Sequence, residues 1–180
     1  MTRTMVLGLL QTFGQMSGYE IQQKMQLSQT DKWAYVKPAS IYHALKRMEK
    51  EGLVVLETIE QTGNRSKAIY NITLEGKKEL ERLVIKSFKE SSVIFPAKLY
   101  TALTFMNEST KEEILNALEE QKLTIQTIYE EMKAGQKEKE NFIDIPENVM
   151  LIFTNMYEQC ELQLNFIKQI NEKLLSQKKK

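Results

Sequence analysis

Pro38 and Gly52 bracket the segment that most constrains what this chain can fold into. A proline suits the first turn of a helix, and a glycine suits the left-handed residue that ends one. At about 100° per residue, apolar residues between them gather on one side and polar or charged residues on the other. The apolar side consists of Ile41, Ala44, Leu45 and Met48. We therefore predict a helix with one face in a protein core and the opposite face free.

The free face of this helix is cationic. Residues 37 to 50 include four lysine or arginine residues against one acid, Glu49. Small residues at the helix start let its N-terminus approach a phosphate or a base edge, and the free N–H groups there attract anions. Aromatic and imidazole side chains could then reach bases or sugars, with the cations on the backbone. An ordinary solvated face is the alternative. The predicted DNA contacts on this helix are Lys37, Ala39, Ser40, Tyr42, His43, Lys46 and Arg47.

Two short runs after Gly52 are rich in β-branched and aromatic residues, which predicts two strands. Gly63 and Asn64 lie between the runs and supply the positive backbone angles that a tight hairpin needs. Arg65 and Lys67 would place two cations at the tip of this hairpin. Directly behind a cationic helix, such a wing is suited to contact a minor groove or a phosphate, so Asn64, Arg65 and Lys67 join the predicted DNA contacts.

Helical spacing also precedes the cationic helix. Apolar residues between Met5 and Phe13 predict a first helix, and the spacing resumes from Tyr19 to Met25 after a break that contains Gly14 and Gly18. We expect residues 26 to 37 to form a loop or a frayed helix end that Trp33 and Tyr35 pack down onto the core. Three helices followed by a hairpin predict a winged helix-turn-helix, in which the third helix enters the major groove of DNA.

Composition excludes several classes of protein. No apolar run approaches the roughly 20 residues that cross a bilayer, and the N-terminal stretch is too soon polar for a secretory signal, which predicts a cytoplasmic protein. With one cysteine, Cys160, and one histidine, His43, we predict neither a disulfide nor a metal site, and Cys160 reads best as a small core residue. No glycine-rich phosphate loop or paired nucleophile and base is found, so we expect no enzyme and no cofactor.

The charge is divided unevenly along the chain. Residues 1 to 80 hold 11 Lys and Arg against 8 Asp and Glu, whereas residues 81 to 180 hold 14 against 16. The basic part is the part with the helix and the hairpin, which favours a nucleic-acid partner.

The first half resembles the PadR family of bacterial transcriptional regulators. The resemblance lies in VLGLL (6–10), GYEIQQKM (18–25), SIYHALKRMEKEGLV (40–54), GNR (63–65) and YNITLEGKKEL (70–80). His43 stands where the family commonly has a proline, and GNR is less arginine-rich than the family's usual turn. The resemblance implies a dimeric winged-helix repressor that binds a roughly palindromic operator and releases it when a small aromatic or lipophilic effector binds. It also implies DNA contacts by Tyr19, Ser40, Tyr42 and Lys46 and a wing contact by Arg65. A core tyrosine is the alternative for Tyr19.

The second half is predicted to be mainly helical. We expect a charged linking helix from residues 73 to 76 onward with Leu80, Leu83, Val84 and Phe88 facing inward, a short helix from Pro96, a long helix from a Ser109–Glu112 capping box to Gly135, and a last helix from Pro146. Apolar residues of the last helix recur every seven residues, which is coiled-coil spacing. Packing within one chain would satisfy the same pattern, but operators with two half-sites need two heads. The predicted dimer interface is Val149, Phe153, Met156, Cys160, Ile167, Ile170 and Leu174.

These features predict a mainly α protein with two domains. Residues 1–88 form a winged-helix DNA-binding domain with its linking helix, and residues 89–180 form a helical domain for dimerisation and effector coupling. An activator of the same fold and a winged helix that binds another protein are the alternatives. Aromatic residues of the second half are candidates to line an effector pocket, although filling a core is the commoner role. They are Phe95, Tyr100, Phe105, Tyr129, Phe142, Phe153 and Tyr157.

Overall fold

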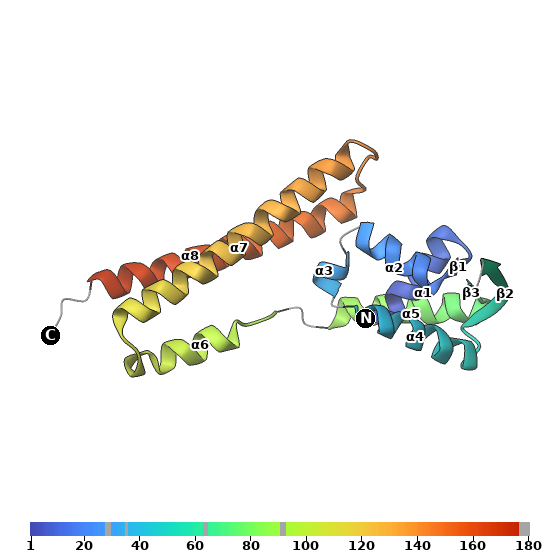
Figure 1. Cartoon of the computed structure of the whole chain (residues 1–180), viewed down its shortest axis with the longest axis horizontal. Coiled ribbons are helices and arrows are strands. Elements are labelled where there is room, and N and C mark those ends of the chain that lie inside the picture. The colour runs from blue at the N-terminus through green and yellow to red at the C-terminus, as the bar shows by residue number, and fades with distance from the viewer. Residues whose placement is uncertain (28–29, 35, 63–64, 91–92, 177–180) are drawn as a thin grey trace. The chain divides into compact units, whose positions relative to one another are not determined.

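The computed structural model describes residues 1–27, 30–34, 36–62, 65–90 and 93–176, with the backbone alone described at 31, 32, 62, 65 and 108. The chain forms two compact units, Met1–Val93 and Ile94–Lys180 (Figure 1). The predicted boundary after residue 88 falls inside the last turn of a helix that ends at Lys89.

The first unit is a winged helix-turn-helix, as the sequence predicted. Its helices are α1 (Thr2–Phe13), α2 (Gly18–Leu27), α3 (Thr30–Ala34), α4 (Pro38–Lys50) and α5 (Leu74–Lys89). The prediction of a loop over residues 26–37 was wrong, because α3 lies within it. Ala34 and Val36 are buried and anchor this stretch to the core, whereas Trp33 is 39% exposed. Tyr35 lies outside the described residues.

The wing is a hairpin of β2 (Val54–Thr62) and β3 (Arg65–Ile72). Thr62 pairs with Arg65, so two residues connect the strands, and these are the predicted turn residues Gly63 and Asn64, which lie outside the described residues. A two-residue strand, β1 (Met16–Ser17), pairs antiparallel with β3 and makes the order β1-β3-β2. Strand β1 could not be predicted from the sequence, since two residues show no periodicity.

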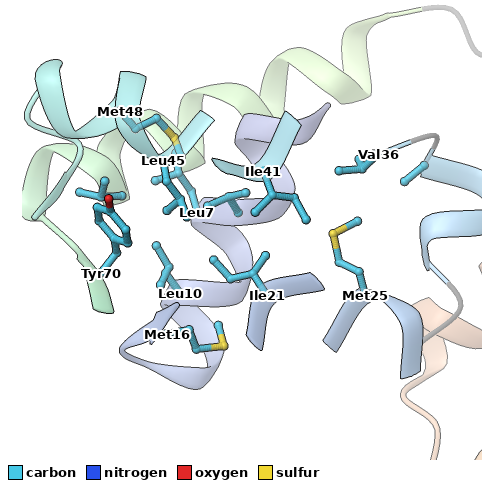
Figure 2. Close-up of a cluster of buried hydrophobic side chains, with 13 residues drawn as sticks. Leu7, Leu10, Met16, Ile21, Met25, Val36, Ile41, Leu45, Met48 and Tyr70 are labelled. Atoms are coloured by element: carbon cyan, nitrogen blue, oxygen red, sulfur yellow. The ribbon is translucent and has the colours of Figure 1, made fainter. Parts of the chain in front are cut away.

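One hydrophobic core holds the first unit together. Figure 2 shows Ile41, Leu45 and Met48 of α4 pointing toward Leu7 and Leu10 of α1. All five side chains are at most 1% exposed. Full burial of a side chain of this size contributes about 1.5–3 kcal/mol. Three such residues on one face fix the rotation of α4 about its own axis, and therefore fix which residues it presents to solvent.

A close backbone contact positions α5. Thr73 caps the helix by accepting a hydrogen bond from the Gly76 N–H at 3.0 Å, and its hydroxyl donates to the Gly52 carbonyl at 2.7 Å. A Cβ on Gly76 would lie 2.0 Å from the carbonyl oxygen of Leu53. Gly52 has φ +73°, the left-handed conformation expected at the end of α4. On α5, Leu80 and Leu83 pack against the core, but Val84 and Phe88 are exposed, the latter by 85%, so the prediction that they face inward was wrong.

The second unit contains α6 (Ala97–Thr104), η1 (Met106–Glu108), α7 (Lys111–Glu140) and α8 (Glu147–Ser176), and the last two lie side by side as a helical hairpin (Figure 1). The capping box of α7 is Thr110 with Glu113, one residue later than predicted. The helix continues through Gly135, which is buried, to Glu140. Packing against α8 outweighs the low helix propensity of one glycine, about 1 kcal/mol.

The seven-residue series of α8 is largely satisfied within the chain. Ile167, Ile170 and Leu174 form a buried cluster with Leu118 of α7, and Phe153 is 8% exposed. Val149, Met156 and Cys160 are half-buried. The four buried residues of the series are already buried within one chain, so the packing of α7 against α8 is enough to account for their spacing. Their part in a dimer interface stays a prediction.

Candidate nucleic-acid interface

The outward face of α4 carries the residues that the sequence predicted there. Tyr42, His43, Lys46 and Arg47 are all exposed, and they alternate along the helix with the core residues Ile41, Leu45 and Met48. At the helix start, Lys37 and Ala39 are exposed and Ser40 is half-buried. The face is therefore open to a partner along its whole length.

The N-terminus of α4 is suited to an anion. Pro38 occupies the first turn, and Lys37 at the N-cap position makes no side-chain hydrogen bond to the helix. The Ser40 hydroxyl donates to the Lys37 carbonyl at 2.6 Å, which keeps the side chain close to the helix end. The positive end of the helix dipole and the flanking lysine together favour a negatively charged group, such as a phosphate.

A cleft of about 930 Å³ lies between the start of α2, the outward face of α4 and strand β3 of the wing. The cleft brings together residues that are far apart in the sequence, and seven of them carry polar or charged side chains. The lining residues are Ser17, Gly18, Tyr19, Tyr42, Leu45, Lys46, Ser66, Lys67, Ala68 and Tyr70.

Tyr19 is a surface residue of this cleft and not a core tyrosine. Its side chain is 55% exposed, and its hydroxyl accepts a hydrogen bond from the Gln23 side-chain amide at 2.9 Å. The core alternative is thereby excluded. Its role in contacting DNA stays a prediction.

Lys67 is held by acids, which the sequence did not reveal. Its ammonium donates to Glu20 at 2.9 Å and lies 3.5 Å from Glu60. Hydrogen bonding to Glu20 raises the pKa of Lys67. The pKa of Glu20 falls to about 2, chiefly because the Ser17 backbone N–H donates to it, and further because Lys67 and the Ser17 hydroxyl do. Lys67 therefore ties the wing to α2, and part of its charge is already offset.

The Ser17–Glu20 pair is the cap of α2. The Ser17 N–H donates to Glu20 at 2.8 Å, and the Glu20 N–H lies 3.2 Å from the Ser17 hydroxyl oxygen, which accepts it. This reciprocal arrangement is a capping box, and its S-x-x-E pattern is visible in the sequence. The pattern identifies the helix start, but it does not indicate that the same carboxylate reaches Lys67.

Arg47 is also engaged. Its Nε donates to Glu51 at 2.9 Å, and Glu51 accepts a second hydrogen bond from Arg3 of α1 at 2.5 Å. Arg3 also reaches Glu79 of α5 at 3.4 Å. The hydrogen bond from Arg47, followed by that from Arg3, lowers the pKa of Glu51. Arg47 remains exposed, so a phosphate can compete with Glu51 for it.

The tip of the wing lies partly outside the described residues. Arg65 begins β3, and only its backbone is described there, while Asn64 is not described. Their predicted DNA contacts stay predictions.

In the described part of the chain, the aromatic residues of the second unit pack in separate groups. Tyr129 packs edge-on against Tyr157 at 5.4 Å between ring centroids, and Phe153 stacks on Tyr157 at 6.2 Å. These three rings fill space between α7 and α8. Phe105 alone of the predicted set lines a separate concavity of about 680 Å³ between α6 and α7. Phe142 is 80% exposed.

Other chemistries receive no support from the described part of the chain. No cluster of three or more metal-ligating side chains is found among these residues. Cys160 is half-buried, and burial raises the pKa of its thiol, which disfavours a nucleophilic thiolate. The described helices include none long and apolar enough to cross a bilayer.

Comparison with known proteins agrees with this geometry. Residues 6–82 match the family model of the transcriptional regulator PadR-like family. Among curated proteins, no sequence match is found.

Solved structures match over nearly the whole chain. Bacillus subtilis PadR in complex with operator DNA is 21% identical with a TM-score of 0.78, and 96% of each chain is covered. The same protein in complex with p-coumaric acid is 19% identical with a TM-score of 0.76, covering 96% of this chain and 97% of that one. The Vibrio cholerae virulence activator AphA is 17% identical with a TM-score of 0.63, covering 98% and 99%. At these identities the structures establish the fold, and the matched family consists of transcriptional regulators, not enzymes.

Proposed function

Since the chain belongs to the PadR-like family of transcriptional regulators, we propose that it is a cytoplasmic, dimeric repressor that binds a roughly palindromic DNA operator and releases it when a small aromatic or lipophilic effector binds. The observation that carries the DNA-binding part is the outward face of α4, with Tyr42, His43, Lys46 and Arg47 exposed beside the cleft and the wing.

The residues of this face fall into groups with different roles in the proposal. Lys46 and Arg47 contact phosphates, and they position α4 in the major groove without reading sequence. Tyr42 and His43 reach base edges or sugars, and Ala39 and Ser40 allow the helix start to approach closely. Tyr19 and Lys67 border the cleft from α2 and the wing. Because Lys67 is already bound to Glu20, its contribution to phosphate binding is smaller than that of Lys46.

A binding titration with the DNA upstream of the protein's own gene tests this assignment. We expect Lys46→Ala to weaken binding about fivefold or more, because it removes one phosphate contact from each head. Lys111→Ala, at the start of α7, is the matched control and should leave the affinity unchanged. Equal effects of the two substitutions would contradict the assignment of the interface to α4.

Dimerisation is supported by the second unit. Leu151 and Leu162 of α8 are 66% and 63% exposed, and Leu123 of α7 is 55% exposed. Exposed leucines on a helical hairpin whose other face is already packed are suited to a second copy. We place the dimer contact at these residues, together with the half-buried Val149, Met156 and Cys160. Light scattering after size exclusion should report twice the mass of one chain, and a monomer at micromolar concentration would contradict the proposal.

Effector binding is supported by the concavity between α6 and α7 and by the fold shared with Bacillus subtilis PadR, a protein solved in complex with p-coumaric acid. Leu103, Phe105 and Met106 provide an apolar wall there. An effector releases DNA only if it binds the free and the DNA-bound forms with different affinity. We use p-coumaric acid as the probe. It should lower the DNA affinity of the wild type, and it should lower the DNA affinity of Leu103→Gln by a smaller factor. Absence of binding in calorimetry with a panel of phenolic acids would remove the effector proposal.

Activation of transcription is the second candidate. It is favoured by the structural match to a virulence activator, AphA, with the same fold. The polarity of regulation depends on where the operator lies relative to the promoter, so a reporter assay with footprinting separates the two. A winged helix that binds only a protein partner is disfavoured, because the outward face of α4 is cationic.

A further inference from the structure

Gly18, the first residue of α2, lies directly against the ring of Tyr42 on α4. A Cβ at Gly18 would be 2.7 Å from Cε1, 2.9 Å from Cδ1 and 3.2 Å from Cζ of that ring. The two shorter distances are too close for two carbon atoms. Any side chain at position 18 would therefore displace the ring.

The backbone of Gly18 offers no separate reason for a glycine. Among the described residues, the glycines with positive φ are Gly14 and Gly52, and Gly18 is not one of them. Alanine also forms helices more readily than glycine does. The three atoms nearest to a Cβ at this position all belong to Tyr42, so the position of that ring is what a side chain would change.

The ring in question borders the cleft. Tyr42 is 46% exposed and lines the cleft together with Tyr19 and Lys46. Contact with α2 restrains one side of the ring, while the remainder is open toward the cleft. An aromatic ring held in this way is pre-organised to meet a base or a sugar, because less side-chain freedom is lost on binding.

We propose that Gly18 is a positioning residue for DNA recognition, and that the Tyr42 ring seated against it discriminates between DNA sequences. The inference rests on the proposed function and deepens it. Phosphate contacts by Lys46 and Arg47 are common to all duplexes, whereas the ring contributes fully only when its contact with the target base is correct. Displacing the ring should therefore reduce specific binding and spare non-specific binding.

The test uses full-length Gly18→Ala, Tyr42→Ala and the double variant, with Gly8→Ala as the matched control. Gly8 is a helical glycine of the same unit, and a Cβ there would meet no atom within 4 Å. Affinity is measured for a duplex that the wild type selects from a random-sequence pool, and for an unselected duplex of equal length.

We expect Gly18→Ala to bind the selected duplex about tenfold more weakly and the unselected duplex as the wild type does. Tyr42→Ala should show the same loss, and the double variant should lose no more than either single variant, since both act through one ring. Gly8→Ala should resemble the wild type. The inference is wrong if Gly18→Ala binds the selected duplex as tightly as the wild type does, or if it weakens binding to the selected and the unselected duplex equally. It is also wrong if the double variant loses more affinity for the selected duplex than Tyr42→Ala does.

A second measurement separates positioning from folding. The single tryptophan, Trp33, lies in the first unit, so its fluorescence reports unfolding of that unit. In the Tyr42→Ala background, adding Gly18→Ala should leave the unfolding midpoint unchanged or raise it, because the ring that the Cβ would meet is gone. A lower midpoint there would show a structural need for glycine and overturn the inference. A wild-type protein that selects no duplex would refute both this inference and the proposed function. A wild-type protein that selects a duplex, with variants that do not behave as predicted, would refute the inference alone.

Discussion

Gly76→Ala should destabilise the first unit, although alanine is the better helix former. The new Cβ would lie 2.0 Å from the Leu53 carbonyl oxygen and 2.8 Å from Cγ1 of Ile72. A relaxed carbon-to-oxygen contact is more than 1 Å longer, so the backbone of Leu53 or of α5 must move. Movement of a side chain alone cannot relieve this contact, because the nearest atom belongs to the backbone.

Three contributions determine how much Gly76→Ala should lower the free energy of unfolding. Overpacking of this kind costs about 1–3 kcal/mol. Moving Leu53 also strains the hydrogen bond from the Thr73 N–H to the Leu53 carbonyl, 3.1 Å long, which is worth about 1 kcal/mol. Helix propensity returns up to about 1 kcal/mol. We therefore expect a net loss of about 1–4 kcal/mol in the free energy of unfolding.

Urea unfolding followed by Trp33 fluorescence measures this loss, since the single tryptophan belongs to the affected unit. Gly8→Ala is the control with the opposite expected sign. It too replaces a helical glycine, but it meets open space and should raise stability by up to about 1 kcal/mol. If Gly76→Ala were neutral or stabilising, the close approach of α5 to Leu53 would be refuted.

Two further predictions concern caps. Glu20→Gln should destabilise the first unit at pH 7, because the pKa of Glu20 is lowered to about 2 in the folded state and its charged form is therefore favoured by folding. That stabilisation is present above about pH 4.5 and is lost as the pH falls toward 2. Because the Glu20 side chain is 39% exposed, screening by solvent limits the stabilisation to about 1 kcal/mol. The variant should show a flatter dependence of unfolding free energy on pH in that window, and an unchanged dependence would contradict the assignment. Thr110→Ala should lower the unfolding free energy of the second unit by about 1 kcal/mol, because Thr110 caps α7. Ser109→Ala should lower it by less, and unfolding followed by circular dichroism measures both. A larger loss for Ser109→Ala would favour the Ser109–Glu112 capping box.

The sequence predicted the elements whose signals are local. The apolar residues of α4 recur at helical spacing, so both the helix and its free face could be predicted, and the structure places Tyr42 and Lys46 on that face. The hairpin followed from β-branched runs around a two-residue turn. The residues that form these patterns lie within a few positions of one another, so they can be recognised in a single sequence.

A local pattern cannot locate a feature when two overlapping sets of residues match it equally well. Ser109 with Glu112 and Thr110 with Glu113 both match S/T-x-x-E, and only the second forms the capping box. The heptads of α8 show a similar ambiguity, because a seven-residue period indicates that a face is buried but not what covers it. In this chain Ile167 and Leu174 are covered by α7 of the same chain.

Contacts between distant residues could not be predicted from one sequence. Lys67 meets Glu20, 47 positions away, and this contact ties the wing to α2 and offsets part of the charge of a predicted DNA contact. Gly18 against Tyr42 is another such contact. Helix α3 also depends on tertiary anchoring, through the burial of Ala34, and its five residues carry too little periodicity to be recognised.

The salt dependence of DNA binding tests the central claim most directly. If each of two heads neutralises about three phosphates, through Lys37, Lys46 and Arg47, then six neutralised phosphates give a slope of log affinity against log salt of about −5. Lys46→Ala should reduce that slope by about two, since one contact is lost from each head. A slope near zero, or one that Lys46→Ala leaves unchanged, would contradict the claim that the outward face of α4 binds the DNA duplex.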